Sequence, residues 1–184
     1  MNYFFSLNAE GGPLLCVDAG AAARWNGAVD DAQDYGNLCA AIDAQPEFSA
    51  MITPIAGLPG VVWEMQGAGT ADVFVADDGR VAVLRAWLSQ DTNEDLKELA
   101  DTKPVSRRVL GVIDVPSGVL AVFWSVESGR TIPQHIDSRF RQIDGTAIKG
   151  SVFALKATTS RYTCCDELVK VRNAHARRLT MTPS

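Results

Sequence analysis

Two apolar runs between residues 105 and 126 constrain the fold of this chain most. Residues 109–113 are Val-Leu-Gly-Val-Ile, and residues 119–124 are Val-Leu-Ala-Val-Phe-Trp. Strands that are buried on both faces carry such nearly continuous apolar residues instead of an alternating pattern. The Pro116-Ser117-Gly118 segment between the runs is typical of a turn, and Pro116 has no N–H to donate inside a central strand. The sequence therefore predicts a hairpin at the centre of a sheet.

A second hairpin is predicted over residues 72–88. The Asp78-Gly79 pair lies between residues 73–75 and 81–84 and favours a two-residue turn, whose twist matches that of the strands. This register places Asp72 opposite Arg85, where unlike charges support the pairing. Further strands are expected at residues 2–8, 14–17, 51–55, 61–65 and 152–157, with residues 162–170 as the hairpin partner of the last.

Two helices complete the prediction. Apolar residues spaced i, i+3, i+4, i+7 predict a helix from Asp34 to about residue 44, with Asp30 or Asp31 as its cap. These apolar residues are Tyr35, Leu38, Cys39 and Ile42. Residues 91–101 carry only a narrow apolar stripe, which indicates a surface helix. Eight or nine strands with two helices predict a single α+β domain over residues 1–184, built on a mostly antiparallel sheet.

Composition limits the classes of protein that the chain fits. Its 184 residues suit one domain, and no apolar run approaches the ~20 residues of a membrane helix. Residues 1–10 contain no basic segment followed by a long apolar core, so they do not resemble a secretory signal. The four cysteines (Cys16, Cys39, Cys164 and Cys165) are too few and too poorly spaced for a disulfide scaffold. We therefore expect reduced thiols and a cytoplasmic location.

The net charge of −5 conceals a strong asymmetry. Residues 1–79 hold one basic and eleven acidic residues, a balance of −10, whereas residues 80–184 hold sixteen basic and eleven acidic residues, a balance of +5. An acidic half of this kind disfavours nucleic acid and suits a basic protein partner. The alternative is a solvated acidic face without a partner.

The titratable residues form no recognisable catalytic or metal-binding pattern. Cys164 or Cys165 with His135 and Asp137 matches no cysteine-hydrolase signature, and small core thiols explain these cysteines better. The two histidines and the Cys-Cys pair lack the spacing of a zinc site. We expect no catalytic residues, no metal and no cofactor, with a small cysteine-dependent hydrolase as the alternative.

The first quarter of the chain resembles a known family. Gly11-Gly12-Pro13 and a short apolar strand are followed by Trp25-Asn26-Gly27, Asp34-Tyr35 and Cys39-Ala40. In this order the motifs are similar to the Imm21 family, immunity proteins of bacterial polymorphic-toxin systems. Val83-Leu84-Arg85 with Trp87 also fits, although the family more often places Trp directly after the Arg. The resemblance implies a protein that binds and neutralises a cognate toxin and is not a catalyst. We expect stoichiometric binding that occludes the active site of the toxin or locks the toxin in an inactive state.

The resemblance and the charge pattern together suggest where a toxin would bind. Since an immunity protein must be present where its toxin acts, we expect a cytoplasmic toxin with a basic active-site surface. The candidate contact residues are four acidic residues and one tryptophan: Trp25, Asp30, Asp31, Asp34 and Glu64. Among the tryptophans, Trp25 is the best candidate for an exposed interface residue, and core packing is the alternative for it. The other motif residues are expected to build the fold: Gly11, Gly12, Pro13, Gly27, Tyr35 and Cys39. An adaptor domain with an unrelated protein partner is a further alternative.

Overall fold

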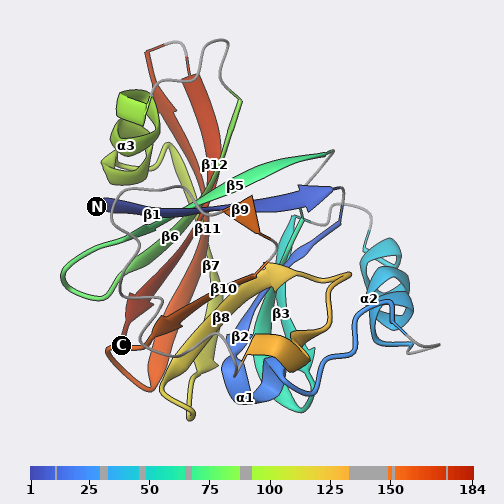
Figure 1. Ribbon diagram of the computed structural model, residues 1–184. Coiled ribbons are helices and arrows are strands. Elements are labelled where there is room, and N and C mark those ends of the chain that lie inside the picture. The colour runs from blue at the N-terminus through green and yellow to red at the C-terminus, as the bar shows by residue number, and fades with distance from the viewer. Residues whose placement is uncertain are drawn as a thin grey trace.

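The protein is an α+β fold of two stacked antiparallel sheets with helices on both outer faces (Figure 1). The computed structural model describes residues 1–10, 12–29, 33–45, 49–64, 68–87, 93–132, 149–150, 152–172 and 174–184. Within these ranges the chain forms twelve strands and three α-helices. The predicted fold class, a mostly antiparallel sheet with few helices, is confirmed.

The larger sheet has seven strands in the order β7-β11-β12-β6-β5-β1-β9. Among its described strand pairs, β1 and β9 run parallel and the others run antiparallel. The bounds of its strands in chain order are β1 Asn2–Glu10, β5 Ala68–Val75, β6 Val81–Trp87, β7 Ser106–Asp114, β9 Lys149–Gly150, β11 Arg161–Val171 and β12 Ala174–Pro183.

The smaller sheet has five strands in the order β10-β8-β2-β4-β3, all antiparallel within the described residues. Their bounds are β2 Leu14–Asp18, β3 Ala50–Ile55, β4 Leu58–Trp63, β8 Val119–Trp124 and β10 Val152–Lys156. The turn between β3 and β4 consists of Ala56 and Gly57, both at positive φ, which is the conformation of a tight two-residue hairpin turn.

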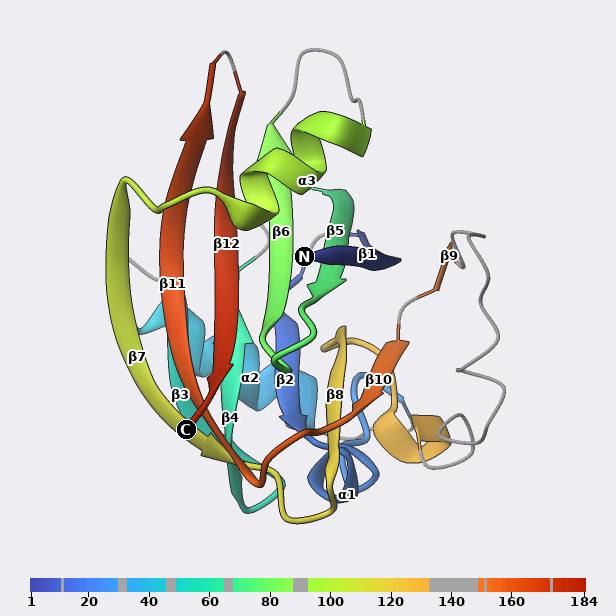
Figure 2. The same cartoon turned by 90° about the vertical axis from the view of Figure 1, so that its left-hand side faces the viewer.

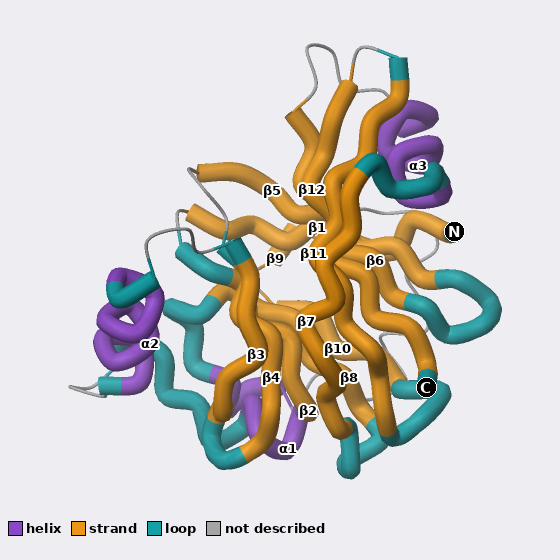
Figure 3. Tube along the Cα trace, turned by 180° about the vertical axis from the view of Figure 1, so that it is seen from behind, coloured by secondary structure: helices purple, strands orange, loops and turns teal. Residues whose placement is uncertain are grey.

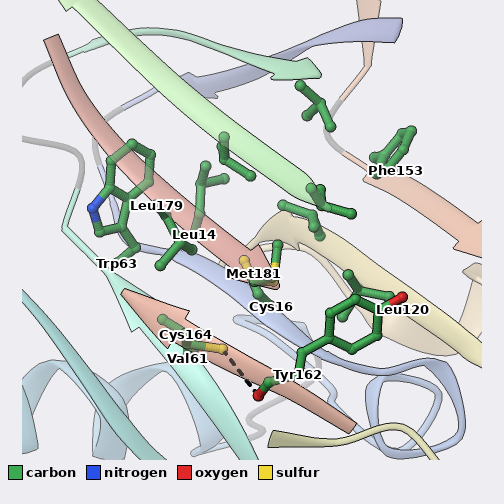
Figure 4. Close-up of a cluster of buried hydrophobic side chains, with 14 of the residues drawn as sticks. Leu14, Cys16, Val61, Trp63, Leu120, Phe153, Tyr162, Cys164, Leu179 and Met181 are labelled. Carbon is green, nitrogen blue, oxygen red and sulfur yellow. Dashed lines mark hydrogen bonds between the residues drawn. The ribbon is translucent and has the colours of Figure 1, made fainter. Parts of the chain in front are cut away.

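The main core lies between the two sheets (Figure 4). Both sheets contribute fully buried side chains to it, because each strand alternates its residues between the two faces of its sheet. Labelled in Figure 4 are Leu14, Cys16, Val61, Trp63, Leu120, Phe153, Tyr162, Cys164, Leu179 and Met181.

Helices cover the outer faces of both sheets (Figures 2 and 3). Helix α3 (Asn93–Asp101) buries Leu99 and Ala100 on the outer face of the larger sheet. Helices α1 (Ala19–Ala22) and α2 (Asp34–Asp43) pack on the outer face of the smaller sheet, with a short 3₁₀ turn, η1 (Gly129–Thr131), beside α1. The predicted apolar stripes of both longer helices therefore face the protein interior.

The predicted central hairpin is wrong in its pairing. Strand β8 is central, as predicted: Leu120 and Val122 face the inter-sheet core, and Ala121 and Phe123 face the outer core. Strand β7, however, pairs with β11 at the edge of the other sheet, and the chain crosses between the sheets around residues 115–118. An apolar run indicates burial but does not specify the pairing partner, and the Pro-Ser-Gly turn connects two sheets here.

Two other predicted pairings also differ from the structure. Strand β10 pairs with β8, and β11 pairs with β12, a strand in the basic C-terminal segment. Between β5 and β6 the turn spans three residues, with Gly79 at φ +82°, so Asp72 lies opposite Leu84 instead of Arg85. Arg80 pairs with the neighbouring Asp78 at 2.8 Å.

Candidate functional site

The margin of the larger sheet formed by β7 exposes aliphatic side chains. In Figure 2, β7 is the outermost strand of this sheet, while α3 lies over other strands. Val109 of β7 is 65% exposed, and Val105, just before the strand, is 67% exposed. Leu168 of the neighbouring β11 is 39% exposed. We define these residues, with Ser106, Arg107 and Arg108 between them, as the β7 margin. Exposed aliphatic side chains on both faces of an edge strand mark this edge as a candidate interaction site.

A β-bulge divides β7 into two halves with different surroundings. The pairing with β11 shifts register between Cys164 and Cys165, which leaves Leu110 as the extra residue. Gly111 follows at φ +138°, and a Cβ there would lie 3.0 Å from Cδ1 of Ile52. Ile113, beyond the bulge, is fully buried in the inter-sheet core, whereas residues 106–109 are exposed. The bulge therefore separates an anchored half from an open half.

Arg107 connects the β7 margin to a buried ion pair. Its Nε lies 3.4 Å from Oε1 of Glu167, and its Nη2 donates to Sγ of Cys165 at 3.1 Å. The contact with Cys165, and then the Glu167 carboxylate, raises the pKa of Arg107. Glu167 is itself buried and accepts a hydrogen bond from Nε of Arg178 at 2.8 Å. The guanidinium of Arg107 remains half-exposed and keeps its charge at the surface.

Arg108 points to the opposite face of β7, toward a cleft of about 340 Å³. Its Nη2 donates to Oγ of Ser49 at 2.7 Å and to the carbonyl of Ala50 at 2.8 Å, and lies 3.4 Å from Oδ2 of Asp166. The cleft is lined by Ser49, Ser106, Arg107, Arg108, Asp166, Glu167, Leu168 and Arg177. This face of the margin thus combines a half-exposed guanidinium with a polar cleft.

Asp166 organises the cleft by accepting hydrogen bonds from both sheets. Arg177 donates to its Oδ1 at 2.8 Å, and Oγ of Ser49 donates to its Oδ2 at 3.0 Å. Nε1 of Trp63 lies 3.3 Å from Oδ1, and the Arg177 guanidinium is 5.6 Å from the centre of the Trp63 ring. Burial, and then the positive charge of Arg177, lowers the pKa of Arg85 on the next strand, while Glu64 opposes this shift. The carboxylate of Asp166 is therefore already engaged by the protein.

The interpretation of Trp25 as an exposed interface residue is contradicted. Its side chain is 5% exposed, and its Nε1 donates to the carbonyl of Ser125 at 2.8 Å. Gly27 makes this packing possible, because it has φ +65° and a Cβ there would lie 2.6 Å from the carbonyl oxygen of Glu127. Both motif residues hold the segment before α2 against the end of β8, and Trp25 is a core residue of the smaller sheet's outer face.

Of the four predicted acidic contact residues, the structure describes Asp34 and Glu64. Asp34 accepts hydrogen bonds from the backbone N–H and the side-chain amide of Asn26, at 2.9 and 3.0 Å. Glu64 is half-buried, and its charge acts on Tyr35 and Arg85. Asp30 and Asp31 lie outside the described residues.

The expected cap of α2 is also corrected. Its N-cap position is occupied by Gln33, which makes no capping hydrogen bond with its side chain. Asp30 and Asp31 therefore do not hold that position.

The remaining motif residues lie around the start of the smaller sheet and α2. A Cβ on Gly12 would lie 2.7 Å from Nε1 of Trp124, and the carbonyl of Pro13 accepts a hydrogen bond from the Ser125 N–H at 3.0 Å. Burial, and then a hydrogen bond with Cys39, raises the pKa of Tyr35. Gly11 lies outside the described residues.

The thiols named in the hydrolase alternative are buried. Cys164 is inaccessible, and burial, followed by the proximity of Cys165, raises its pKa to about 12. A nucleophilic cysteine needs an accessible thiolate, so this environment disfavours catalysis by Cys164. Cys165 is also fully buried, beneath Arg107. His135 and Asp137 lie outside the described residues.

In the ranges that the structure covers, no group of three or more His, Cys, Asp or Glu side chains is arranged to hold a metal ion. None of the described helices is long and apolar enough to cross a membrane. A second cleft of about 360 Å³ lies between the end of α3 and the larger sheet, and it shares Arg107, Glu167 and Arg178 with the network beneath the β7 margin.

By its fold and its most exposed apolar surface, the chain is a two-sheet α+β protein with an open, basic sheet edge. Comparisons with protein-family models, with curated proteins and with solved structures gave no match.

The exposure of the β7 margin does not follow from the sequence, because its apolar run is typical of a central strand. Arg107-Arg108 directly before that run was the available signal, since basic residues are common on edge strands.

Proposed function

We propose that this protein binds a cognate bacterial toxin in the cytoplasm and neutralises it by stoichiometric occlusion of its active site. The resemblance of the first quarter of the chain to the Imm21 family supports this role. The structural observation that carries the proposal is the β7 margin, where Val105, Val109 and Leu168 are exposed beside Arg107 and Arg108. An open strand with exposed aliphatic and arginine side chains suits a polypeptide partner.

The proposal keeps an acidic contact surface but restricts it to Asp30 and Asp31. Trp25 is buried and Asp34 is bonded to Asn26, so reversing the charge of Asp34 would disturb the fold as well as any interface. Asp30 and Asp31 are the better test of an acidic contact. In the proposal they meet the basic active-site surface of the toxin, while the β7 margin supplies apolar and backbone contacts.

Co-expression with the product of the reading frame directly upstream tests the proposal. We expect the two proteins to co-elute in size-exclusion chromatography, and we expect this protein to restore growth to cells that express the upstream product. Lysine at both Asp30 and Asp31 should weaken the complex without unfolding the protein. Separate elution together with unrelieved toxicity would show that this pair is not a toxin and its inhibitor.

A further inference from the structure

We infer that β7 is a docking strand for an extended, acidic segment of the partner, which pairs with residues 106–109 and lengthens the seven-stranded sheet. This inference rests on the proposed function for the existence of a polypeptide partner. It goes beyond that function by naming the secondary structure and the charge of the segment that binds, and the strand of this chain that receives it.

The backbone of β7 provides the first argument. β7 ends the strand order of its sheet, and among the described strands it pairs only with β11. The outer side of such a strand presents N–H and C=O groups that lack a partner in the sheet. Peptides that add to a sheet edge use these groups for affinity and their alternating side chains for specificity. Residues 106–109 are exposed on both faces of the strand, which leaves this part of the edge accessible to an added segment.

The length of the docking site follows from the bulge. Beyond Leu110 the strand changes register against β11, and Ile113 in its second half is buried in the inter-sheet core. Pairing that begins at Ser106 therefore loses its regular register after Val109. The site fits a short extended segment of about four or five residues and does not fit a long strand or a helix.

The charge of the occupant follows from the ion pairs beneath the margin. Glu167 is shared by Arg107 and Arg178, and Asp166 is shared by Arg108 and Arg177. Two carboxylates thus face four guanidinium groups, and the surplus of two positive charges lies at the surface. The shorter contacts are to the more buried arginines, at 2.8 Å, while the half-exposed Arg107 and Arg108 lie 3.4 Å from the shared carboxylates. A partner carboxylate on either face of the added strand would pair with Arg107 or Arg108 and reduce the surplus of positive charge.

Aliphatic side chains in the segment would cover the exposed residues of the margin. Arg107 and Val109 lie on one face of β7, and Leu168 lies on the other face, opposite Ser106. A segment in which acidic and aliphatic residues occur on each face places a carboxylate near an arginine and a methyl group near Val109 or Leu168. Cross-strand pairs of these kinds stabilise an antiparallel pairing by a few tenths of a kcal/mol each.

A second copy of this chain does not match the margin. Two-fold pairing of β7 with itself along residues 106–109 would bring Arg107 and Arg108 of both copies close together. Like charges opposite each other destabilise a strand pair, so the arginines disfavour self-association. We therefore expect a monomer in light-scattering measurements when no partner is present.

Backbone amide NMR on the isolated full-length protein tests the inference without the toxin. The probe is a short, blocked peptide with the repeat Glu-Glu-Val-Val, which places both residue types on each face of a strand. The control peptide has lysine in place of glutamate. At millimolar concentration we expect saturable shifts of the amide signals of residues 106–109 with the acidic peptide. The lysine peptide should bind at least about tenfold more weakly. Absent shifts, shifts centred on the acidic residues of the first half, or equal binding of both peptides would overturn the inference.

A pair of variants at one exposed position provides the matched control. Val109→Glu adds a negative charge to the margin and should weaken binding of the acidic peptide about tenfold, whereas Val109→Lys should preserve or strengthen it. Lys156→Glu changes the charge of an exposed residue on β10, the edge strand of the other sheet, and should have no effect. Equal binding by Val109→Glu and Val109→Lys would contradict the assigned polarity of the site.

The same variants separate this inference from the proposed function. If the wild-type protein binds and neutralises the upstream product but Val109→Glu does so equally well, the docking strand is wrong and the immunity role stands. If the wild-type protein fails to bind that product while the acidic peptide still shifts residues 106–109, the toxin assignment is wrong and β7 remains a docking strand for another acidic polypeptide.

Discussion

Arg178 provides the most direct test of what holds α3 onto the larger sheet. The side chain is buried, and its Nε donates to Oε2 of Glu167 at 2.8 Å. Its Nη1 donates to the carbonyls of Leu99 and Ala100, at 2.9 and 2.7 Å, in the last turn of α3. Backbone carbonyls in the last turn of a helix lack helical hydrogen-bond partners. A single guanidinium therefore supplies hydrogen bonds to the Glu167 carboxylate and to two carbonyls at the end of α3.

Replacing Arg178 by Met tests this arrangement because Met preserves the length of the side chain and removes its charge and donors. Glu167 would remain buried with only the longer contact to Arg107, at 3.4 Å. Removing one partner of a buried ion pair costs about 3–5 kcal/mol. In a chain of this length, 1 kcal/mol corresponds to about 2–4 °C in Tm, so we expect a fall of about 6–20 °C.

Urea unfolding followed by tryptophan fluorescence, with calorimetry for Tm, measures the effect. The matched control is Arg161→Met, because Arg161 pairs with Asp114 at 3.0 Å but both side chains are exposed. It should cost about 0–1 kcal/mol. Combining Arg178→Met with Glu167→Gln should recover at least about 1 kcal/mol, since no unpaired charge then stays buried. Equal losses for Arg178→Met and Arg161→Met would refute the assignment of Arg178 as the anchor of α3.

The remaining stability predictions concern one glycine and the buried thiols. Gly27→Ala should cost at least about 2 kcal/mol in urea unfolding, because residue 27 has positive φ and a Cβ there would contact a backbone carbonyl. Gly36→Ala in α2, where a Cβ meets no neighbour, should be neutral or stabilising by up to about 1 kcal/mol. Equal effects of the two substitutions would contradict the described turn at Gly27. A thiol reagent at pH 8 should label the half-buried Cys39 in the native protein but neither Cys16 nor Cys164 until the protein unfolds, and rapid labelling of all three would contradict their burial. Burial raises the folded-state pKa of Cys164 from 9.0 to about 12 and also raises that of Cys16. Their contribution to stability is therefore complete below pH 9 and is lost as the pH rises above 9. At pH 10 the free energy of unfolding should be lower than at pH 8 by about 1 kcal/mol for each thiol, and an unchanged urea midpoint would show that these pKa values are not raised.

Local patterns in the sequence predicted the individual elements well. The apolar spacing around Leu38 is a property of one helix, and the run at residues 119–124 reflects burial of β8 on both faces, so both were accessible from short windows. The fold class followed from the number and type of these elements. The environment of β7, in contrast, is determined by its pairing with β11 and by the crossing of the chain to the other sheet at its end. These contacts join residues about fifty positions apart, and composition does not encode them.

The candidate site was harder to predict because exposure depends on the same distant contacts. Trp25, flanked by Arg24 and Asn26, is the best candidate from the sequence for an exposed tryptophan, but Gly27 allows its indole to pack against the end of β8. Arg178 lies in a basic C-terminal segment, a sequence context typical of solvated residues, but it is buried at the end of α3. Val109 is the opposite case: it belongs to an apolar run that is typical of burial, but it is exposed at the edge of the sheet. In each case the neighbouring element, and not the residue's own sequence context, decides the environment.

The central claim is that this protein neutralises a toxin by binding it, and a titration in cell-free protein synthesis tests it most directly. The upstream gene product is added at a concentration that stops synthesis, and this protein is then added in increasing amounts. The proposal predicts that synthesis recovers linearly and is complete near an equimolar ratio, with Val109→Lys and Val109→Glu compared in parallel for the contribution of β7. Inhibition that persists at a large molar excess of the wild-type protein would contradict the claim.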